Sequence, residues 1–411
     1  MSLGLYISVP FCRTKCSYCN FASGVFSKSV YENYVARLVE DIANSGKLAA
    51  ELGCALDASA DSVYLGGGTP SILSAAQLLR IFAAVRGQFA VTPDAEITVE
   101  CAPGTLTPAL VETLLRCAVN RVSLGVQSFV DREAQSVGRL HKRSTVLEEI
   151  SRLREAGLGN LNIDLIAGLP HQTAESWAFS LSETIAAGVP HVSVYMLEVD
   201  DDSRLGRELI AGGARYHAHF VPDDDATADF YQQACEMLAA ARIEQYEISN
   251  FARAATRSQD NELHSNESRH NLKYWTRQPY LGFGVDAHSM LAVDHHEGDR
   301  CQAVRFATPD SLDAYMNRVP HTVTPVSAQA AIEETLFLGL RLNRGVDLEQ
   351  LGAEFKTDIL ESAIQQSVQD GLLEQQGTTV RLTARGRLLS NKVFERFLAE
   401  EKVGTGHVNP R

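Results

Sequence analysis

The chain has 411 residues, of which 45% are hydrophobic and 21% are charged, a composition typical of a globular protein with a large core. Its net charge of −14 argues against a general nucleic-acid binder, so we expect no nucleic acid among its partners. It has no apolar run long enough to span a bilayer and no positively charged signal segment at its start, and its eight cysteines without an export signal indicate a reducing compartment. We therefore expect a cytoplasmic protein, with any membrane association made through a partner.

Short β-rich runs alternate with helical stretches over the first 200 residues. The expected strands are residues 3–9, 62–65, 96–100, 122–127, 161–166 and 191–197, and the expected helices include residues 75–89, 108–117 and 144–156. Repeated β-α units predict a parallel sheet with right-handed crossovers. Six such units are fewer than the eight of a complete TIM barrel, so the predicted fold class is α/β, a partial (β/α)6 TIM-like barrel.

Three cysteines follow the first expected strand. Cys12, Cys16 and Cys19 have the spacing C-x3-C-x2-C. Three thiolates in one short loop, with no fourth ligand nearby, favour an iron–sulfur cluster that leaves one iron open. A zinc-bound loop is the alternative, but structural zinc has four protein ligands and the nearest histidine, His141, is remote in the sequence.

Polar and glycine-rich residues follow several of the other expected strands. The second strand leads into Gly66-Gly-Gly-Thr-Pro70, the third ends on Glu100, the fourth ends on Gln127, and the fifth carries Asp164. Glycines at a strand end let the backbone approach a ligand closely, and this run lacks the lysine of a phosphate-binding P-loop. In barrel folds active sites form at this end of the strands, although a single carboxylate could equally form a salt bridge or a helix cap.

The pattern changes beyond residue 200. We expect the acidic clusters 200–202 and 223–225 to be solvated loops and residues 254–268 to be a flexible loop. The chain becomes helical again from Ser327, and a hairpin over residues 372–383 precedes a helix from Arg385, which resembles a winged-helix module. The expected division is 1–200 for the barrel with the cluster and ligand site, 201–325 for a barrel extension, 326–400 for a helical, winged α+β domain, and 401–411 for a flexible tail.

Taken together, these motifs resemble the radical S-adenosylmethionine (SAM) superfamily and, within it, the oxygen-independent coproporphyrinogen III oxidase (HemN) group. The resemblance extends from about residue 6 to residue 397. Besides the cysteine spacing and the glycine run, the matching motifs are Gly125-Val-Gln-Ser-Phe129, Asp164-Leu-Ile-Ala-Gly-Leu-Pro170, Tyr246-Glu-Ile-Ser-Asn-Phe251 and Gly282-Phe-Gly284. The resemblance implies a barrel of the radical SAM type and a HemN-like C-terminal domain.

Three features make the chain more similar to the HemW-type heme chaperones of this group than to the oxidase. The oxidase typically has a longer N-terminal segment and a further cysteine two residues past the third one, where this chain has Phe21. His270-Asn-Leu-Lys-Tyr-Trp275 matches the H-N-x-x-Y-W motif of the chaperones. Two positions depart from the usual pattern: Ser8 replaces a histidine, and Ala102 replaces an asparagine.

The resemblance implies a role for each matching residue. Cys12, Cys16 and Cys19 would ligate a four-iron–four-sulfur (4Fe-4S) cluster whose open iron binds SAM. The residues expected to surround SAM are Tyr6, Tyr18, Gly67, Gly68, Thr69, Glu100, Gln127, Arg139 and Asp164. The residues expected near a bound heme are His270, Tyr274 and Trp275, and His288 is a further histidine that could approach one.

The preferred hypothesis is a heme chaperone that binds heme as cargo and delivers it to acceptor hemoproteins, respiratory ones among the candidates. The alternative is an enzyme that converts coproporphyrinogen III to protoporphyrinogen IX by radical oxidative decarboxylation, and a zinc-stabilised structural module is a third reading. An electron donor such as flavodoxin or ferredoxin is an expected partner if SAM is cleaved. A homodimer and a monomer both remain open.

Overall fold

The computed structural model describes residues 2–254, 256–257, 263–293, 301–351 and 358–398. It divides into two compact units. The first unit contains Met1–Tyr274 and Gln278–Ser327, and the second contains Trp275–Arg277 and Ala328–Arg411. The first unit carries the cysteine loop and the expected parallel sheet.

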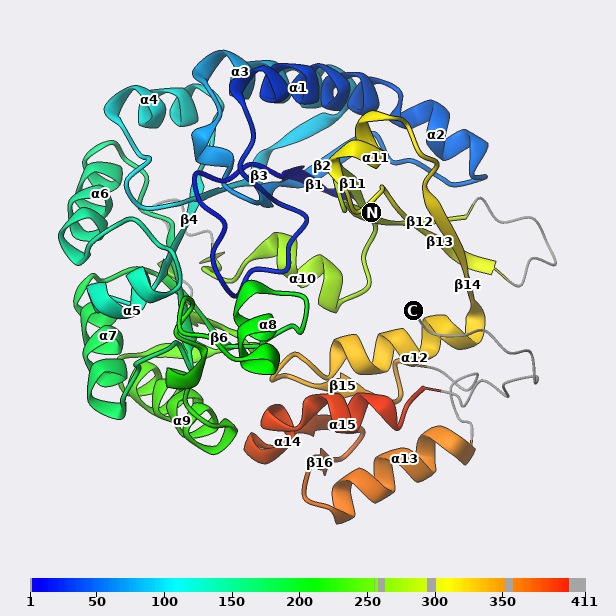
Figure 1. Cartoon of the computed structure of the whole chain (residues 1–411). Coiled ribbons are helices and arrows are strands. Elements are labelled where there is room, and N and C mark those ends of the chain that lie inside the picture. Colours follow the sequence, from blue (N-terminus) through cyan, green and yellow to red (C-terminus); the bar gives the residue numbers. More distant parts are fainter. Residues whose placement is uncertain (1, 255, 258–262, 294–300, 352–357, 399–411) are drawn as a thin grey trace. The chain divides into compact units, whose positions relative to one another are not determined.

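The described strands and helices of the first unit alternate over most of its length (Figure 1). The strands are β1 (Leu3–Val9), β2 (Ser59–Gly67), β3 (Ala90–Cys101), β4 (Arg121–Gln127), β5 (Leu161–Ala167), β6 (His191–Met196), β7 (Ile243–Gln245), β8 (Asn250–Arg253), β9 (Thr256–Arg257), β10 (Leu263–His264), β11 (Tyr280–Phe283), β12 (His288–Ala292), β13 (Cys301–Ala307) and β14 (Thr322–Ser327). The helices are α1 (Lys28–Ala43), α2 (Ser45–Glu51), α3 (Ala75–Gln88), α4 (Pro108–Arg116), α5 (Asp131–Ser136), α6 (Arg143–Glu155), α7 (Ala174–Ala186), α8 (Arg204–Ala211), α9 (Asp224–Ala240), α10 (Arg269–Trp275) and α11 (Leu312–Met316), with short 3-10 turns at Pro70–Ile72 and Ala218–Phe220.

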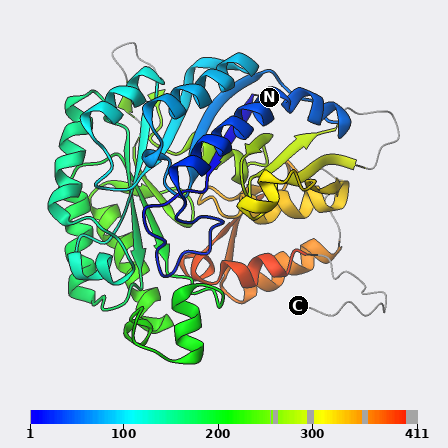
Figure 2. The same cartoon turned by 45° about the horizontal axis from the view of Figure 1, so that its top comes forward.

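The main sheet confirms the predicted parallel β-α architecture and extends it at both edges. Its strand order is β14-β13-β12-β11-β1-β2-β3-β4-β5-β6-β8-β7. Strands β1 to β6 are mutually parallel, and β11 adds a further parallel strand beside β1. The strands outside this run pair antiparallel. Helices α1, α3, α4, α6 and α7 cover the outer face of the curled sheet, as Figures 1 and 2 show.

Burial explains why these segments adopt their structures. In β1 every residue except Tyr6 is buried, as expected for a parallel strand covered on both faces. The buried face of α1 is formed by Tyr34, Val35, Leu38 and Ile42, which recur at helical spacing. Parallel strands that are buried on both faces bring their carboxyl ends to one common edge, and the cysteine loop leaves β1 at that edge.

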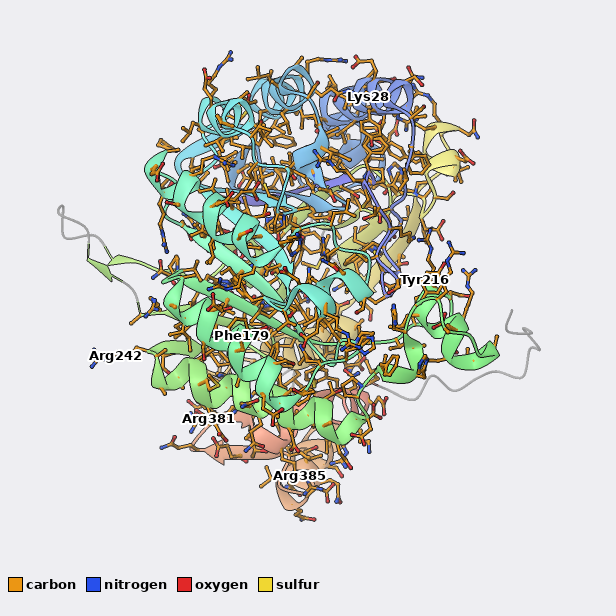
Figure 3. The ribbon with its side chains drawn as sticks, turned by 60° about the vertical axis from the view of Figure 1, so that its left-hand side comes forward. Lys28, Phe179, Tyr216, Arg242, Arg381 and Arg385 are labelled. Carbon is orange, nitrogen blue, oxygen red and sulfur yellow. The ribbon has the colours of Figure 1, made fainter. Side chains whose placement is uncertain are left out.

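Helix α7 offers a matched test of this packing. Trp177 is fully buried, and its indole Nε1 donates to the carbonyl of Phe230 at 2.7 Å. Phe179, two residues later and labelled in Figure 3, is 43% exposed. We expect Trp177→Phe to lower the free energy of unfolding by about 1–3 kcal/mol, because it removes a buried hydrogen bond and opens a small void. Phe179→Leu is the control and should change stability by less than about 0.5 kcal/mol. Urea unfolding of both variants measures the difference, and equal losses would contradict the assignment.

Two expectations beyond residue 200 are wrong. Residues 223–225 are not a loop but the start of α9: the Asp223 side chain caps the helix by accepting from the Ala226 N–H, and the next two aspartates lie in the first turn, where negative charge is favoured. The expected loop 254–268 contains a two-stranded antiparallel ladder, β9 with β10; residues 255 and 258–262 lie outside the described part. The cluster 200–202 is an exposed turn, as predicted.

The second unit confirms the expected winged-helix-like topology. Its elements are α12 (Ala328–Gly339), β15 (Val346–Asp347), α13 (Asp358–Gln369), β16 (Leu373–Gln376), β17 (Thr379–Leu382), α14 (Ala384–Leu388) and α15 (Ser390–Glu395). The strands form an antiparallel sheet in the order β15-β17-β16. Trp275–Arg277 belongs to this unit: Arg277 Nε lies 2.8 Å from Glu334 Oε2, and the Arg341 guanidinium covers the Trp275 ring at 4.2 Å. The expected tail 401–411 lies outside the described residues.

Within the part of the chain that the structure describes, no helix has both the length and the apolar character needed to cross a membrane.

Candidate functional site

The cysteine loop links the end of β1 to α1 and is closed by backbone hydrogen bonds. The Cys12 N–H donates to Gly24 O at 2.8 Å and the Gly24 N–H donates to Pro10 O at 2.9 Å, so the two ends of the loop are fastened together. The Ser17 N–H donates to Val137 O at 3.1 Å, which ties the middle of the loop to the segment after α5. The loop is therefore held in place by the protein backbone.

The three cysteines of this loop are free thiols in the structure. Burial raises the pKa of Cys12, and the Thr69 hydroxyl donates to Cys12 Sγ at 3.7 Å. Metal ligation requires thiolates, so loading of a cluster would release protons here. Among the described residues, no three His, Cys, Asp or Glu side chains gather around a single metal-ion position. An iron–sulfur cluster does not need such convergence, because each cysteine binds a different iron, so the loop fits the predicted cluster.

The glycine run packs directly against the cysteine loop. A Cβ atom on Gly68 would lie 2.7 Å from both Val9 O and Phe11 O, so only glycine fits at this position. The Gly68 N–H donates to Val9 O, and the Thr69 N–H donates to Phe11 O, each at 2.8 Å. Gly67 has a φ of +100°, which favours glycine. The run thus serves to join β2 to the cysteine loop, and its predicted contact with SAM remains a prediction.

Glu100 lies beside this run, at the carboxyl end of β3. Its Oε2 accepts the Gly67 N–H at 3.2 Å, and its Oε1 accepts from the Tyr64 hydroxyl at 2.8 Å. Burial, followed by the nearby Asp164 carboxylate, raises the pKa of Glu100 to about 7. A carboxyl whose charged form is disfavoured by its surroundings is well suited to accept an ammonium group, since a bound cation would offset that cost.

Two buried polar atoms in the same region have no hydrogen-bond partner among the described residues. Gln127, with a φ of +69°, ends β4 and is 6% exposed, and its Oε1 accepts no hydrogen bond among the described residues. The Nε of Arg139 is likewise unpartnered there, while its Nη2 donates to the Tyr18 hydroxyl at 3.3 Å. Orphaned buried polar atoms are costly and indicate an absent partner. SAM carries an ammonium and a carboxylate, which are the complements of an amide oxygen and a guanidinium, so these residues fit it.

Asp164 differs because its carboxylate already has partners. Its Oδ2 accepts from Ser123 Oγ at 2.9 Å and its Oδ1 accepts from Asn162 Nδ2 at 2.7 Å. The network continues through Ser193 and His191, which also contact Asn162. Asp164 is therefore part of an internal hydrogen-bond network. Its negative charge helps to raise the pKa of Glu100.

Sequence reasoning missed the other members of this network. They occupy adjacent register positions on parallel strands, Ser123 opposite Asn162 and Asp164 opposite Ser193. A signal was present, because small polar residues recur on β4, β5 and β6 in strands that are otherwise apolar. Tyr64, the partner of Glu100, was also missed.

Two cavities border the cysteine loop. The larger, of about 310 Å3, is lined by Tyr6, Ser8, Gly67 and Gly68 among others. The smaller, of about 140 Å3, is lined by residues including Cys16, Thr69, Ala102 and Arg139. Each cavity therefore contains predicted SAM-binding residues. Each also contains one position at which the chain departs from the usual pattern, Ser8 in the larger cavity and Ala102 in the smaller one.

The three residues of the His270 motif lie in different surroundings. His270 is 1% exposed, its Nδ1 contacts Ser62 Oγ at 3.0 Å and its Nε2 contacts the Tyr274 hydroxyl at 2.8 Å. Burial lowers the pKa of His270 to about 3, so the ring is neutral. With both nitrogens engaged, neither can coordinate iron in this conformation. Tyr274 lines the larger cavity, whereas Trp275 packs within the second unit.

Family models match two parts of the chain. The radical SAM superfamily model matches residues 6–182, and the HemN C-terminal domain model matches residues 326–389. A match to the radical SAM superfamily implies a four-iron–four-sulfur cluster and SAM.

Curated relatives are similar along the full length. The heme chaperone HemW of Lactococcus lactis is 31% identical, with 96% of this chain and 97% of the relative covered. The heme chaperone HemW of Bacillus subtilis is 30% identical, with 96% and 99% covered, and that of Escherichia coli is 28% identical, with 97% and 98% covered.

Among solved structures, the coproporphyrinogen III oxidase HemN of Escherichia coli, a radical SAM enzyme, superposes with a TM-score of 0.77. The two are 23% identical, and the superposition covers 96% of this chain and 90% of that one. At this identity the likeness concerns the fold, which agrees with the predicted partial barrel and C-terminal domain.

Proposed function

Because the chain belongs to the HemW family of heme chaperones, we propose that it binds heme and delivers it to acceptor hemoproteins. The observation that carries this proposal is the similarity to the HemW of Lactococcus lactis, which is 31% identical and includes 96% of the chain. The similarity therefore includes the cysteine loop, the glycine run and the H-N-x-x-Y-W motif.

The chain's own residues have distinct tasks in this proposal. Cys12, Cys16 and Cys19 hold the cluster, which when loaded supplies an electron to SAM. Arg139 binds the SAM carboxylate, and Glu100 and Gln127 accept hydrogen bonds from its ammonium group. Glu100 and Gln127 lie at the ends of the neighbouring parallel strands β3 and β4. The strands fix the distance between the two side chains before SAM binds.

Hemin titration of the anaerobically purified, cluster-loaded protein tests the proposal. We expect a saturable Soret band with about one hemin per chain, because a chaperone must hold its cargo in a defined site. A linear, non-saturating rise would contradict it. Formation of protoporphyrinogen from coproporphyrinogen, lost in Cys16→Ser, would instead establish the oxidase alternative.

A further inference from the structure

The larger cavity beside the cysteine loop is lined by His288, whose imidazole contacts the Asp286 carboxylate. We propose that this cavity is the heme site, with His288 as the axial ligand of the heme iron and Asp286 as the residue that orients it. The inference deepens the proposed function and depends on it, since it assigns the cargo to a place and to an iron ligand.

The walls of the cavity suit a flat macrocycle. Tyr6, Tyr274 and Tyr280 line it, together with Phe21, whose ring is 61% exposed at the mouth. Aromatic rings provide large, rigid apolar surfaces with a preference for offset or edge contacts. The cavity has a volume of about 310 Å3, at the lower end of the roughly 300–1,000 Å3 of small-molecule sites, and its lining includes the predicted SAM contacts Tyr6, Gly67 and Gly68. Only one edge of a porphyrin would therefore enter it, beside SAM, and the opposite edge would stay exposed. An exposed edge suits a protein that must pass its cargo on.

The hydrogen-bond partners of the histidines distinguish His288 from the buried ones. His270 and His191 each have both ring nitrogens engaged by side chains, and His141 contacts the Val126 carbonyl through Nε2. His288 lines the cavity and is 69% exposed.

The Asp286 carboxylate stands beside this imidazole. Its Oδ1 lies 3.7 Å from His288 Nε2, and among the described residues no hydrogen bond reaches the other ring nitrogen, Nδ1. Nδ1 is therefore the nitrogen available to iron. A carboxylate that contacts the second nitrogen of a ligating imidazole fixes its tautomer and strengthens it as a ligand. Asp310 and the Tyr6 hydroxyl also lie within the electrostatic reach of the Asp286 carboxylate.

The turn that carries this pair is rigidly mounted. The Tyr34 hydroxyl donates to Ser8 O at 2.7 Å and accepts the Val285 N–H at 3.1 Å, which fastens the turn to β1. Gly284 has a φ of +95°, and a Cβ there would lie 2.3 Å from Tyr34 Oη. Only glycine therefore fits at this position of the turn. A ligand on a fixed element can meet iron without a large ordering cost.

The experiment compares hemin binding by the full-length, cluster-loaded protein and its His288→Ala variant. We expect at least a tenfold rise in the hemin Kd and loss of the histidine-ligated signature in the Soret and EPR spectra, with soluble imidazole restoring that signature. Asp286→Asn should keep the ligand but shift the Soret band and weaken binding a few-fold. His219→Ala removes another exposed histidine of the first unit and serves as the matched control, with no expected change.

The outcomes separate this inference from the proposed function. If the wild-type protein shows no saturable hemin binding, the proposed function fails. If the wild type binds hemin and His288→Ala binds it with the same affinity and spectrum, the assignment of the ligand is wrong and heme binding stands. Equal losses in His288→Ala and His219→Ala would also overturn the assignment, since they would indicate adsorption to surface histidines.

Discussion

Replacement of Cys16 by serine is expected to abolish the cluster. The purified variant should lose the broad visible absorption of the cluster, and its iron and sulfide should fall from about four of each per chain to a small fraction of that. A serine hydroxyl stays protonated at neutral pH, whereas iron ligation needs a thiolate. Tyr18 and Arg139 lie within the electrostatic reach of the Cys16 sulfur, so loss of the cluster should also weaken SAM binding.

Cys235→Ser is the matched control for this prediction. Cys235 is also a partly exposed cysteine, but it lies on α9 and its Sγ is 3.9 Å from Gln245 Oε1, a contact that a hydroxyl can replace. Iron analysis, sulfide analysis and circular dichroism of the two variants decide the matter. A Cys16→Ser protein that keeps its iron and sulfide would refute the assignment, and stoichiometric zinc in the wild type would favour the structural zinc alternative.

The parts of the fold that the sequence predicts well are those set by local pattern. The helices expected at 75–89, 108–117 and 144–156 are found as α3, α4 and α6, within one residue at each end. They could be predicted because amphipathic periodicity and capping depend on residues that are close together in the sequence. The expectation of a loop at 223–225 is wrong because it was based on composition and not on capping residues. Composition suggested a solvated loop, while the capping chemistry of Asp223 indicated a helix start.

The parts that sequence does not predict depend on contacts between distant residues. Strand β11 joins the parallel sheet beside β1, a pairing of residues about 276 positions apart, such as Tyr6 opposite Gly282. The motif places His270 near a bound heme, but the partner of its Nδ1, Ser62, is 208 positions away in the sequence. A motif identifies which residues matter, but only the fold tells which of their atoms are already engaged.

The Glu100→Gln substitution should weaken SAM binding roughly 10- to 100-fold. A hydrogen bond to a charged partner contributes about 1.5–3 kcal/mol, and the neutral amide cannot offset the ammonium charge. Because the pKa of Glu100 is about 7, the wild-type affinity should rise as the pH increases from about 6 to 8, as the carboxyl becomes charged before SAM arrives. In Glu100→Gln this pH dependence should flatten. Calorimetric titration with SAM across this range measures both effects.

Stability should move in the opposite direction, and this separates a binding role from a structural one. The folded-state pKa of Glu100 is raised from 4.5 to about 7, so its neutral form is the one the fold favours. The corresponding stability is present below about pH 4.5 and is lost as the pH rises through about 7. Without SAM, Glu100→Gln should therefore melt at a higher temperature than the wild type at about pH 8 and at nearly the same temperature at about pH 5.

The exposed Glu112→Gln on α4 should change neither the affinity for SAM nor the melting temperature. A variant that binds SAM weakly and also melts earlier at pH 8 would mean that Glu100 holds the fold together, whereas weaker binding with higher stability would mean that the fold tolerates a costly carboxylate for the sake of its ligand.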